Sequence, residues 1–149
     1  MAPDKAQIPF VLRQALRADV PGIQRVRHAV KENQLTSAVI NDDDVVDAME
    51  RTGRGWVVEQ GDEIVAFAIG NCETGNIWAL FVDPAFEGLG HGRRLQDEML
   101  RWLADCGLSF LFLSTEANTR AQAFYETTGW TNAGLLPSGE VRFERWLQP

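Results

Sequence analysis

The chain has 149 residues, 45% of them hydrophobic and 23% charged, a balance typical of a folded globular protein and not of a disordered chain. The net charge is −7 and no basic stripe is present, so nucleic acid is not an expected partner, and no membrane is expected because no segment resembles a membrane span. We expect one domain over residues 1–149, with residues 1–9 as a loose tail. Those first residues hold no apolar run of signal-peptide length, which predicts a cytoplasmic protein.

The first third of the chain is predicted to form a strand and two helices. Alternating residues from Phe10 to Ala15 indicate a strand with Phe10 and Leu12 facing inward. A helix follows, with Asp19 as its N-cap and an apolar stripe that continues to about residue 31. The acidic residues 41–44 are typical of the cap and first turn of a second helix. A metal site is disfavoured there, because consecutive helical residues cannot all face one ion.

The middle of the chain is predicted to form an antiparallel meander of three strands. Two strands, at 56–60 and 63–70, are joined by Gly61 and Asp62, a sequence typical of a tight hairpin. The third strand is the unbroken apolar run 77–82, which ends before Pro84.

The last third alternates helices and strands. A helix from Gly90 to about Asp105 and a buried strand at 110–113 indicate a parallel crossover from the strand at 77–82. A helix over 119–128 follows, and two strands complete the chain. The two cysteines, Cys72 and Cys106, have no C-x-x-C spacing and are predicted to be reduced core thiols.

The loop between residues 83 and 94 is the strongest candidate for a binding site. It carries three glycines, Gly88, Gly90 and Gly92, before Arg93 and Arg94 in the first turn of the predicted helix. Arginines at a helix N-terminus oppose the macrodipole, but they fit a loop whose free N–H groups hold an anion. The alternative is an ordinary strand–loop–helix connection with solvated arginines. The glycine spacing fits neither a Walker loop nor a dinucleotide fingerprint.

Two segments, 82–95 and 118–130, together resemble the GNAT superfamily of acyl-CoA-dependent N-acetyltransferases. The cofactor loop of that family reads Gln/Arg-x-x-Gly-x-Gly/Ala, and Glu87–Gly92 matches it at both glycine positions. The second motif is N-x-x-A-x-x-F-Y-x-x-x-G-[FW], which Asn118–Trp130 matches. Glu87 departs from the family, which has Arg or Gln there. The resemblance implies an α/β (α+β) fold with a mixed, mostly antiparallel central sheet of six to seven strands, a splayed pair, and helices on both faces.

The resemblance also implies a site for acetyl-CoA, used as a co-substrate, between the strands at 77–82 and 110–113. The residues implied in cofactor binding lie on the first strand, the loop and the late helix: Leu80, Phe81, Val82, Gly88, Leu89, Gly90, His91, Gly92, Arg93, Arg94, Asn118 and Phe124. With Glu87 acidic, Arg93, Arg94 and His91 would supply the positive charge for the phosphates. Asn118 either contacts the pantetheine arm or caps its helix. No metal is implied.

For the chemistry, the resemblance places Tyr125 near the sulfur as the general acid that protonates the leaving thiolate. The base is left open between Glu32, Glu73 and a chain of waters. The implied reaction is direct attack by a primary amine of a small molecule or peptide. A non-catalytic acyl-CoA-binding module is the alternative, and a homodimer is left open.

Overall fold

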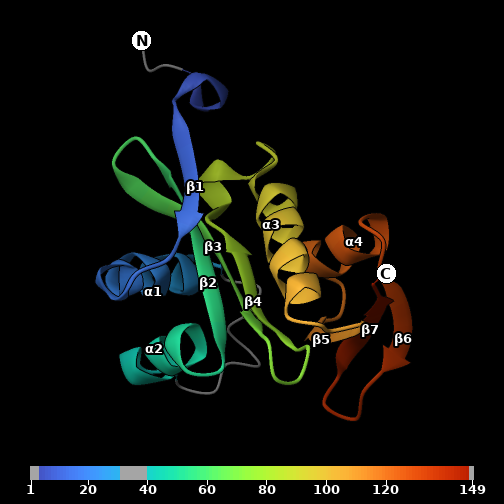
Figure 1. Ribbon diagram of the computed structural model, residues 1–149. Helices are drawn as coiled ribbons and strands as arrows, with labels where there is room; N and C mark the ends of the chain where they lie inside the picture. Colours follow the sequence, from blue (N-terminus) through green and yellow to red (C-terminus); the bar gives the residue numbers. More distant parts are fainter. Residues whose placement is uncertain (1–3, 31–39, 148–149) are drawn as a thin grey trace.

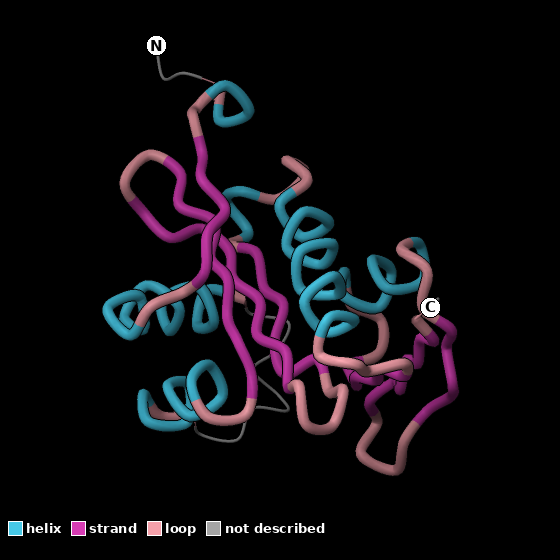
Figure 2. Tube along the Cα trace, viewed as in Figure 1, coloured by secondary structure: helices cyan, strands magenta, loops and turns pink. Residues whose placement is uncertain are grey.

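The computed structural model describes residues 4–30 and 40–147, in which seven strands form two sheets that are flanked by α-helices (Figures 1 and 2). The strands are β1 (Phe10–Gln14), β2 (Gly53–Gln60), β3 (Glu63–Asn71), β4 (Ile77–Val82), β5 (Phe110–Glu116), β6 (Thr131–Leu135) and β7 (Glu140–Trp146). The α-helices are α1 (Val20–Ala29), α2 (Asp42–Glu50), α3 (His91–Asp105) and α4 (Arg120–Thr127). Short 3-10 turns are η1 (Lys5–Gln7), η2 (Arg17–Asp19) and η4 (Pro84–Phe86).

The first sheet is an antiparallel meander in the order β1-β2-β3-β4. Gly61 and Asp62, between β2 and β3, both have positive φ, at 58° and 69°. Positive φ at both central residues is the geometry of a type I′ turn, which suits the twist of a two-residue hairpin. The predicted hairpin and three-stranded meander are therefore confirmed.

The second sheet has the order β5-β7-β6, again antiparallel. A parallel bridge between Asn76 and Phe112 connects it to the first sheet, and the Phe112 N–H donates to the Gly75 carbonyl at 3.1 Å. The chain crosses from β4 to β5 through α3, so the predicted parallel crossover and splayed pair are confirmed. The predicted central sheet is divided in two, because β4 and β5 are bridged only at their N-terminal ends among the described residues.

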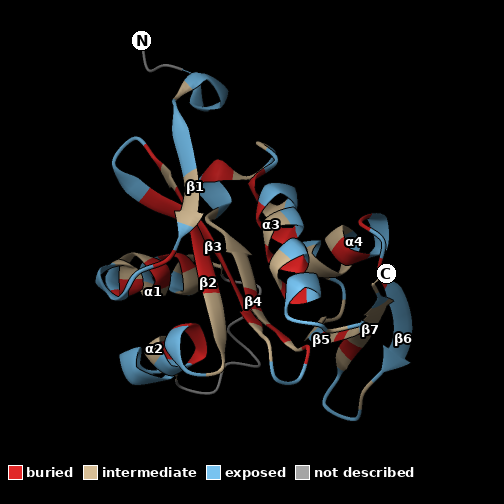
Figure 3. Ribbon diagram, in the orientation of Figure 1, coloured by how far each residue is buried: buried red, intermediate tan, exposed pale blue. Residues whose placement is uncertain are grey.

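Each face of the first sheet has its own hydrophobic core, and buried residues run along its central strands (Figure 3). Ile23 of α1 and Val45 of α2 are fully buried against Phe67 on one face. On the other face α3 presents Leu95, Met99, Leu100 and Leu103 at helical spacing. Full burial of each such side chain contributes about 1.5–3 kcal/mol, and this fixes α3 against the sheet.

Two predicted caps have different outcomes. Asn41 and Asp44 form a reciprocal capping box at α2, each side chain accepting from the other's backbone N–H at 2.9 Å. Asp19 occupies the predicted N-cap position of α1, but its side chain makes no capping hydrogen bond. Its carboxylate accepts instead from the Leu16 N–H at 2.8 Å and from the Arg13 guanidinium at 2.8 and 2.9 Å. The strong ionic partner on β1 keeps this carboxylate away from the start of the helix.

Two core assignments hold only in part. Phe10 faces inward, with its ring edge-on to the buried His91 at 5.0 Å, but it is still 38% exposed because it lies at the outer end of the edge strand β1. Cys72 is half-buried and packs against the core, whereas Cys106 is exposed because it is the C-cap of α3, beyond the last buried turn at Leu103. Across residues 4–30 and 40–147, no helix is both long and apolar enough to cross a membrane.

Candidate active site

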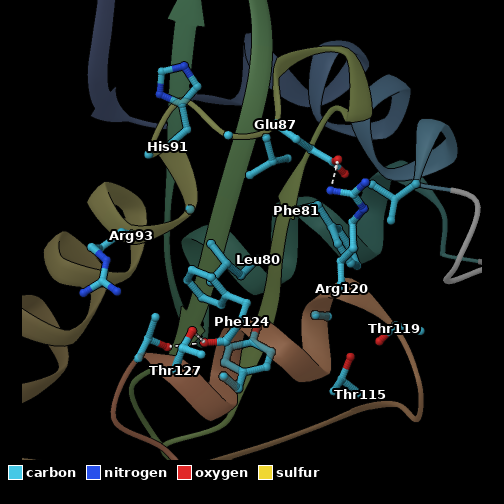
Figure 4. Close-up of a pocket in the computed structure, with 18 of the residues that line it drawn as sticks. Leu80, Phe81, Glu87, His91, Arg93, Thr115, Thr119, Arg120, Phe124 and Thr127 are labelled. Atoms are coloured by element: carbon cyan, nitrogen blue, oxygen red, sulfur yellow. Dashed lines mark hydrogen bonds and ion pairs between the residues drawn. The ribbon is translucent and has the colours of Figure 1, made fainter.

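A cavity of about 360 Å³ opens where β4 and β5 diverge (Figure 4). One wall is the C-terminal half of β4, and the other is the end of β5 together with α4. The loop from Phe86 to Arg93 closes one end. Strands that are joined at one end and diverge at the other leave backbone N–H and C=O groups of β4 without a strand partner, so this wall can pair with an extended ligand.

The glycine loop gives the cavity a wall of backbone donors. Gly88 and Gly90 have φ of 78° and 86°, a conformation that residues with a side chain rarely adopt. These turns bring the start of α3 to the cavity, where the first N–H groups of a helix have no helical acceptor. A Cβ at Gly92 would lie 3.4 Å from the Phe124 ring and 3.7 Å from Val82, so glycine keeps this space open.

A buried polar chain, the Gln60–His91–Arg94 relay, holds the loop from beneath. The Gln60 amide donates to the Lys5 and Ile8 carbonyls at 2.6 and 2.9 Å, which leaves its oxygen as the acceptor facing His91 Nε2 at 2.9 Å. Arg94 donates to His91 Nδ1 at 3.2 Å and to the Leu89 carbonyl at 2.7 Å. The relay therefore connects the N-terminal segment, the end of β2 and the loop.

These contacts fix the charge of His91. Nε2 carries the proton because it faces an acceptor, and Nδ1 must be bare because it faces a guanidinium. Burial lowers the pKa of His91, and the positive charge of Arg94 lowers it further. The imidazole is only 2% exposed and Figure 4 shows it turned away from the other labelled side chains, so it adds no positive charge to the cavity.

The N-terminal segment, expected to be a loose tail, contacts the same loop. Lys5 donates to the Ala85 carbonyl at 2.6 Å, and its ammonium lies 4.6 Å from the centre of the Phe86 ring. Asp4 caps the short turn η1 by accepting from the Ala6 N–H. Residues 4–8 therefore cover the outer side of the loop.

Tyr125 lies on the α4 wall of the cavity and is only 5% exposed. Its ring packs edge-on against Phe124 and Trp130, with centroids 5.3 and 5.7 Å away. Burial raises the pKa of its hydroxyl well above the ordinary value, so the phenol stays protonated at neutral pH. Buried Gln96 of α3 accepts from the Trp130 indole at 2.9 Å and so joins α3 to the segment that follows α4.

An ion pair at the mouth of the cavity joins the α4 wall to the loop that closes one end. Arg120, the first residue of α4, lies 2.7 Å from the carboxylate of Glu87 on the loop. Figure 4 shows the two side chains reaching toward each other, with Arg93 lying apart beside α3. An arginine in the first turn of a helix opposes the dipole, and the carboxylate offsets this cost.

The comparisons with known proteins agree with this geometry. The family model described as "Acetyltransferase (GNAT) family" matches residues 20–130. This chain belongs to the acetyltransferase (GNAT) family. The resemblance drawn from the two motifs is therefore confirmed.

Curated GNAT relatives match over part of the chain. The chain is 36% identical over 74 residues to a [ribosomal protein bS18]-alanine N-acetyltransferase of Haemophilus ducreyi, over 46% of this chain and 50% of that protein. It is 44% identical over 59 residues to a mycothiol acetyltransferase of Beutenbergia cavernae, over 39% of this chain and 20% of that protein. The matched stretches thus span half or less of these relatives.

The fold matches over nearly the whole chain. The PaiA N-acetyltransferase of Thermoplasma acidophilum, solved in complex with coenzyme A, superposes with a TM-score of 0.80. The superposition covers 94% of this chain and 100% of that chain at 12% identity. At this identity the likeness supports the GNAT fold alone, and it agrees with the predicted fold class.

Most of the sequence-predicted site residues come together around the cavity. Its lining includes Leu80, Phe81, Val82, Gly88, Gly90, His91, Gly92, Arg93, Phe124 and Tyr125. Leu89 and Arg94 line a smaller hollow of about 210 Å³, shared with Gly88 and His91, on the side of the N-terminal segment. Their predicted contact with a cofactor remains a prediction, and Arg94 has a different set of partners from the one expected.

The remaining predicted residues lie elsewhere. Asn118 is not among the lining residues, and its N–H donates to the Gln122 side chain at 2.7 Å. Thr119, not Asn118, is the N-cap of α4 and accepts from the Gln122 N–H. Asn118 has φ of 64°, outside the extended range of an N-cap, which explains the one-residue error. Glu32 lies outside the described residues, and exposed Glu73 is in the β3–β4 turn, away from the lining.

Sequence reasoning missed two residues. Arg120 carried the same signal that drew attention to Arg93, a cation in the first turn of a helix. Gln60 alternates with Trp56 and Val58 along β2, so its position indicated an inward side chain even though its polarity suggested a surface.

Proposed function

We propose that this protein transfers the acetyl group of acetyl-CoA to a primary amine. The observation that carries the proposal is the cavity between the diverging strands β4 and β5, with backbone donors at one end and a protonated tyrosine in its wall. Membership of the acetyltransferase family supports the reaction class, and the CoA complex of a fold neighbour supports the donor.

The residues present fit a CoA ligand. The N–H groups at the start of α3 suit a pyrophosphate, since a helix N-terminus favours an anion. Gly92 leaves room for it, and no atom lies within 4 Å of a Cβ built at Gly88. The exposed edge of β4 near Leu80–Val82 suits the amide groups of a pantetheine arm, which would pair with it like an added strand.

The donor supplies a thioester, and Tyr125 supplies the proton. When the amine attacks the carbonyl carbon, a C–N bond forms, the C–S bond breaks and the sulfur leaves as a thiolate. Tyr125, kept neutral by burial, holds a proton on the cavity wall for that sulfur. Such positioned proton transfer contributes about 10²–10⁴-fold to rate. The base that takes the proton of the amine stays a prediction at Glu32, with Glu73 and water as rivals.

The acceptor is proposed only as a primary amine. The names of the two curated relatives point to different acceptors, one the alanine of a ribosomal protein and the other mycothiol. Both match over half or less of their own length, so neither acceptor is assigned to this chain.

The test is thiol release from acetyl-CoA across a panel of amines, with direct CoA titration alongside. Tyr125→Phe should lower kcat by about 10²-fold or more while the Kd for CoA changes by less than about twofold. Trp146→Phe, an aromatic change at an exposed position outside the cavity, is the matched control and should retain full activity. CoA binding without turnover on any amine would favour the non-catalytic module. Full activity of Tyr125→Phe would refute its role as the acid.

A further inference from the structure

The charges around the cavity do not favour an anion by themselves. The described side chains that line it include two arginines, Arg93 and Arg120, and two carboxylates, Glu87 and Glu116. His91 is held neutral by its hydrogen bonds, so it does not change this balance. A ligand with several phosphate charges therefore needs a cation brought close to the loop.

Arg120 is the cation whose position the structure fixes at the mouth. Its guanidinium is 2.7 Å from the Glu87 carboxylate, one residue before Gly88 and the loop donors. The Arg120 side chain is 75% exposed while that of Glu87 is 30% exposed, so the glutamate is the more anchored partner. The pair draws a long side chain from α4 toward the loop that closes one end of the cavity (Figure 4).

We infer that Arg120 binds a phosphate of the donor and that Glu87 is the positioning residue for Arg120. The inference rests on the proposed function, because it requires CoA in this cavity. A guanidinium has five N–H donors, so it can keep the carboxylate with one edge and bind phosphate with another. The acidic residue at the loop then assists anion binding through its partner, instead of opposing it.

Replacing Glu87 distinguishes the two roles by the sign of the effect. If Glu87 only repels phosphate, Glu87→Gln should tighten CoA binding. If Glu87 positions Arg120, the same change should weaken CoA binding about threefold to tenfold, because an amide holds a guanidinium less firmly. The two outcomes lie on opposite sides of the wild-type Kd.

Arg120 itself is tested by comparing two ligands, CoA and pantetheine, which lacks the phosphates. Arg120→Ala should weaken CoA binding about tenfold or more, the size of a charge-assisted hydrogen bond. Pantetheine binding should change by less than about twofold. Adding Glu87→Gln to Arg120→Ala should cause no further loss, because the positioned group is already gone.

Arg101→Ala is the matched control. Arg101 also pairs with a glutamate, Glu98 at 2.6 Å, but this pair lies on α3 outside the cavity lining. Its removal should leave the Kd for CoA unchanged. Tighter binding by Glu87→Gln, unchanged CoA binding by Arg120→Ala, or equal losses for CoA and pantetheine would each overturn the inference. Failure of the wild-type protein to bind CoA would instead refute the proposed function.

Discussion

Replacing Gln60 with alanine is expected to weaken both the fold and the cofactor loop. The side chain is 2% exposed and makes three hydrogen bonds, at 2.6, 2.9 and 2.9 Å. The carbonyls of Lys5 and Ile8 lie in a largely exposed segment, so water can replace their lost bonds. The Nε2–H of His91 is buried and would be left without an acceptor.

The expected loss of stability follows from these three hydrogen bonds. Each ordinary bond contributes about 1 kcal/mol net, and a buried donor left unsatisfied costs about 1–3 kcal/mol. We therefore expect a loss of about 3 kcal/mol in the free energy of unfolding, which lowers Tm by about 6–12 °C in a chain of this size. Because the relay holds Leu89 through Arg94, the Kd for CoA should also rise, by about tenfold.

The assay is urea unfolding followed by tryptophan fluorescence, with calorimetric CoA titration of the folded variant. Gln14→Ala, at an exposed position near the end of β1, is the control and should change stability by less than about 0.5 kcal/mol. A loss below about 1 kcal/mol for Gln60→Ala would show that the relay is not a structural anchor. Unchanged CoA affinity would show that the loop keeps its shape without it.

Two further predictions concern Gly75, beside the bridge between the two sheets, and the loss of stability at low pH. Gly75→Ala should cost about 2 kcal/mol or more, because Gly75 has φ of 84° and a Cβ would lie 2.4 Å from the Phe110 carbonyl oxygen. Gly107→Ala is the control, because φ is 91° there but no atom lies within 4 Å of the added Cβ. Urea unfolding of this variant should show only the backbone cost of about 1–2 kcal/mol, and equal losses of stability in the two variants would contradict the clash at Gly75. The Arg13 guanidinium holds the pKa of Asp19 below its usual range in the folded protein. The ion pair therefore stabilises the fold at pH values above the unfolded-state pKa of about 3.9, and this stabilisation is lost as the pH falls through the lower folded-state pKa. Asp19→Asn should therefore cost about 1–2 kcal/mol at pH 7, and the gap to wild type should close below pH 4; a gap that stays constant with pH would refute the ionic origin.

Periodicity predicted most of the fold because each element has one clear pattern. The helix predicted from Gly90 to about Asp105 and the hairpin residues Gly61 and Asp62 both follow from local sequence, and both predictions hold. Phe10 is more exposed than a core residue because alternation indicates which residues share a face and does not indicate how fully that face is covered. The division into two sheets depends on where β4 and β5 separate, a long-range feature with no local signal.

The sequence predicted the part of the cavity that is formed by backbone groups. Glycines at 88, 90 and 92 have a conformational reason to recur in a loop that approaches a ligand. Charges were harder, because an arginine that binds phosphate and one that binds a buried histidine have the same sequence pattern. Arg94, predicted to contact phosphate, contacts His91 in the structure, whereas Arg120, which was not predicted, reaches Glu87 at the mouth of the cavity.

The single bridge between Asn76 and Phe112 has a consequence for the order of folding. Strands β2, β3 and β4 are joined by short turns, so their pairing closes short loops and is fast, whereas β1 pairs with β2 across the intervening helices α1 and α2. Contact between β4 and β5 requires the chain to close over α3, and the second sheet must assemble with β7 between β5 and β6. The cavity lies between these two units, so we expect it to form last. Recovery of CoA binding after dilution from denaturant should then follow the slowest refolding phase, later than the burial of the tryptophan on β2.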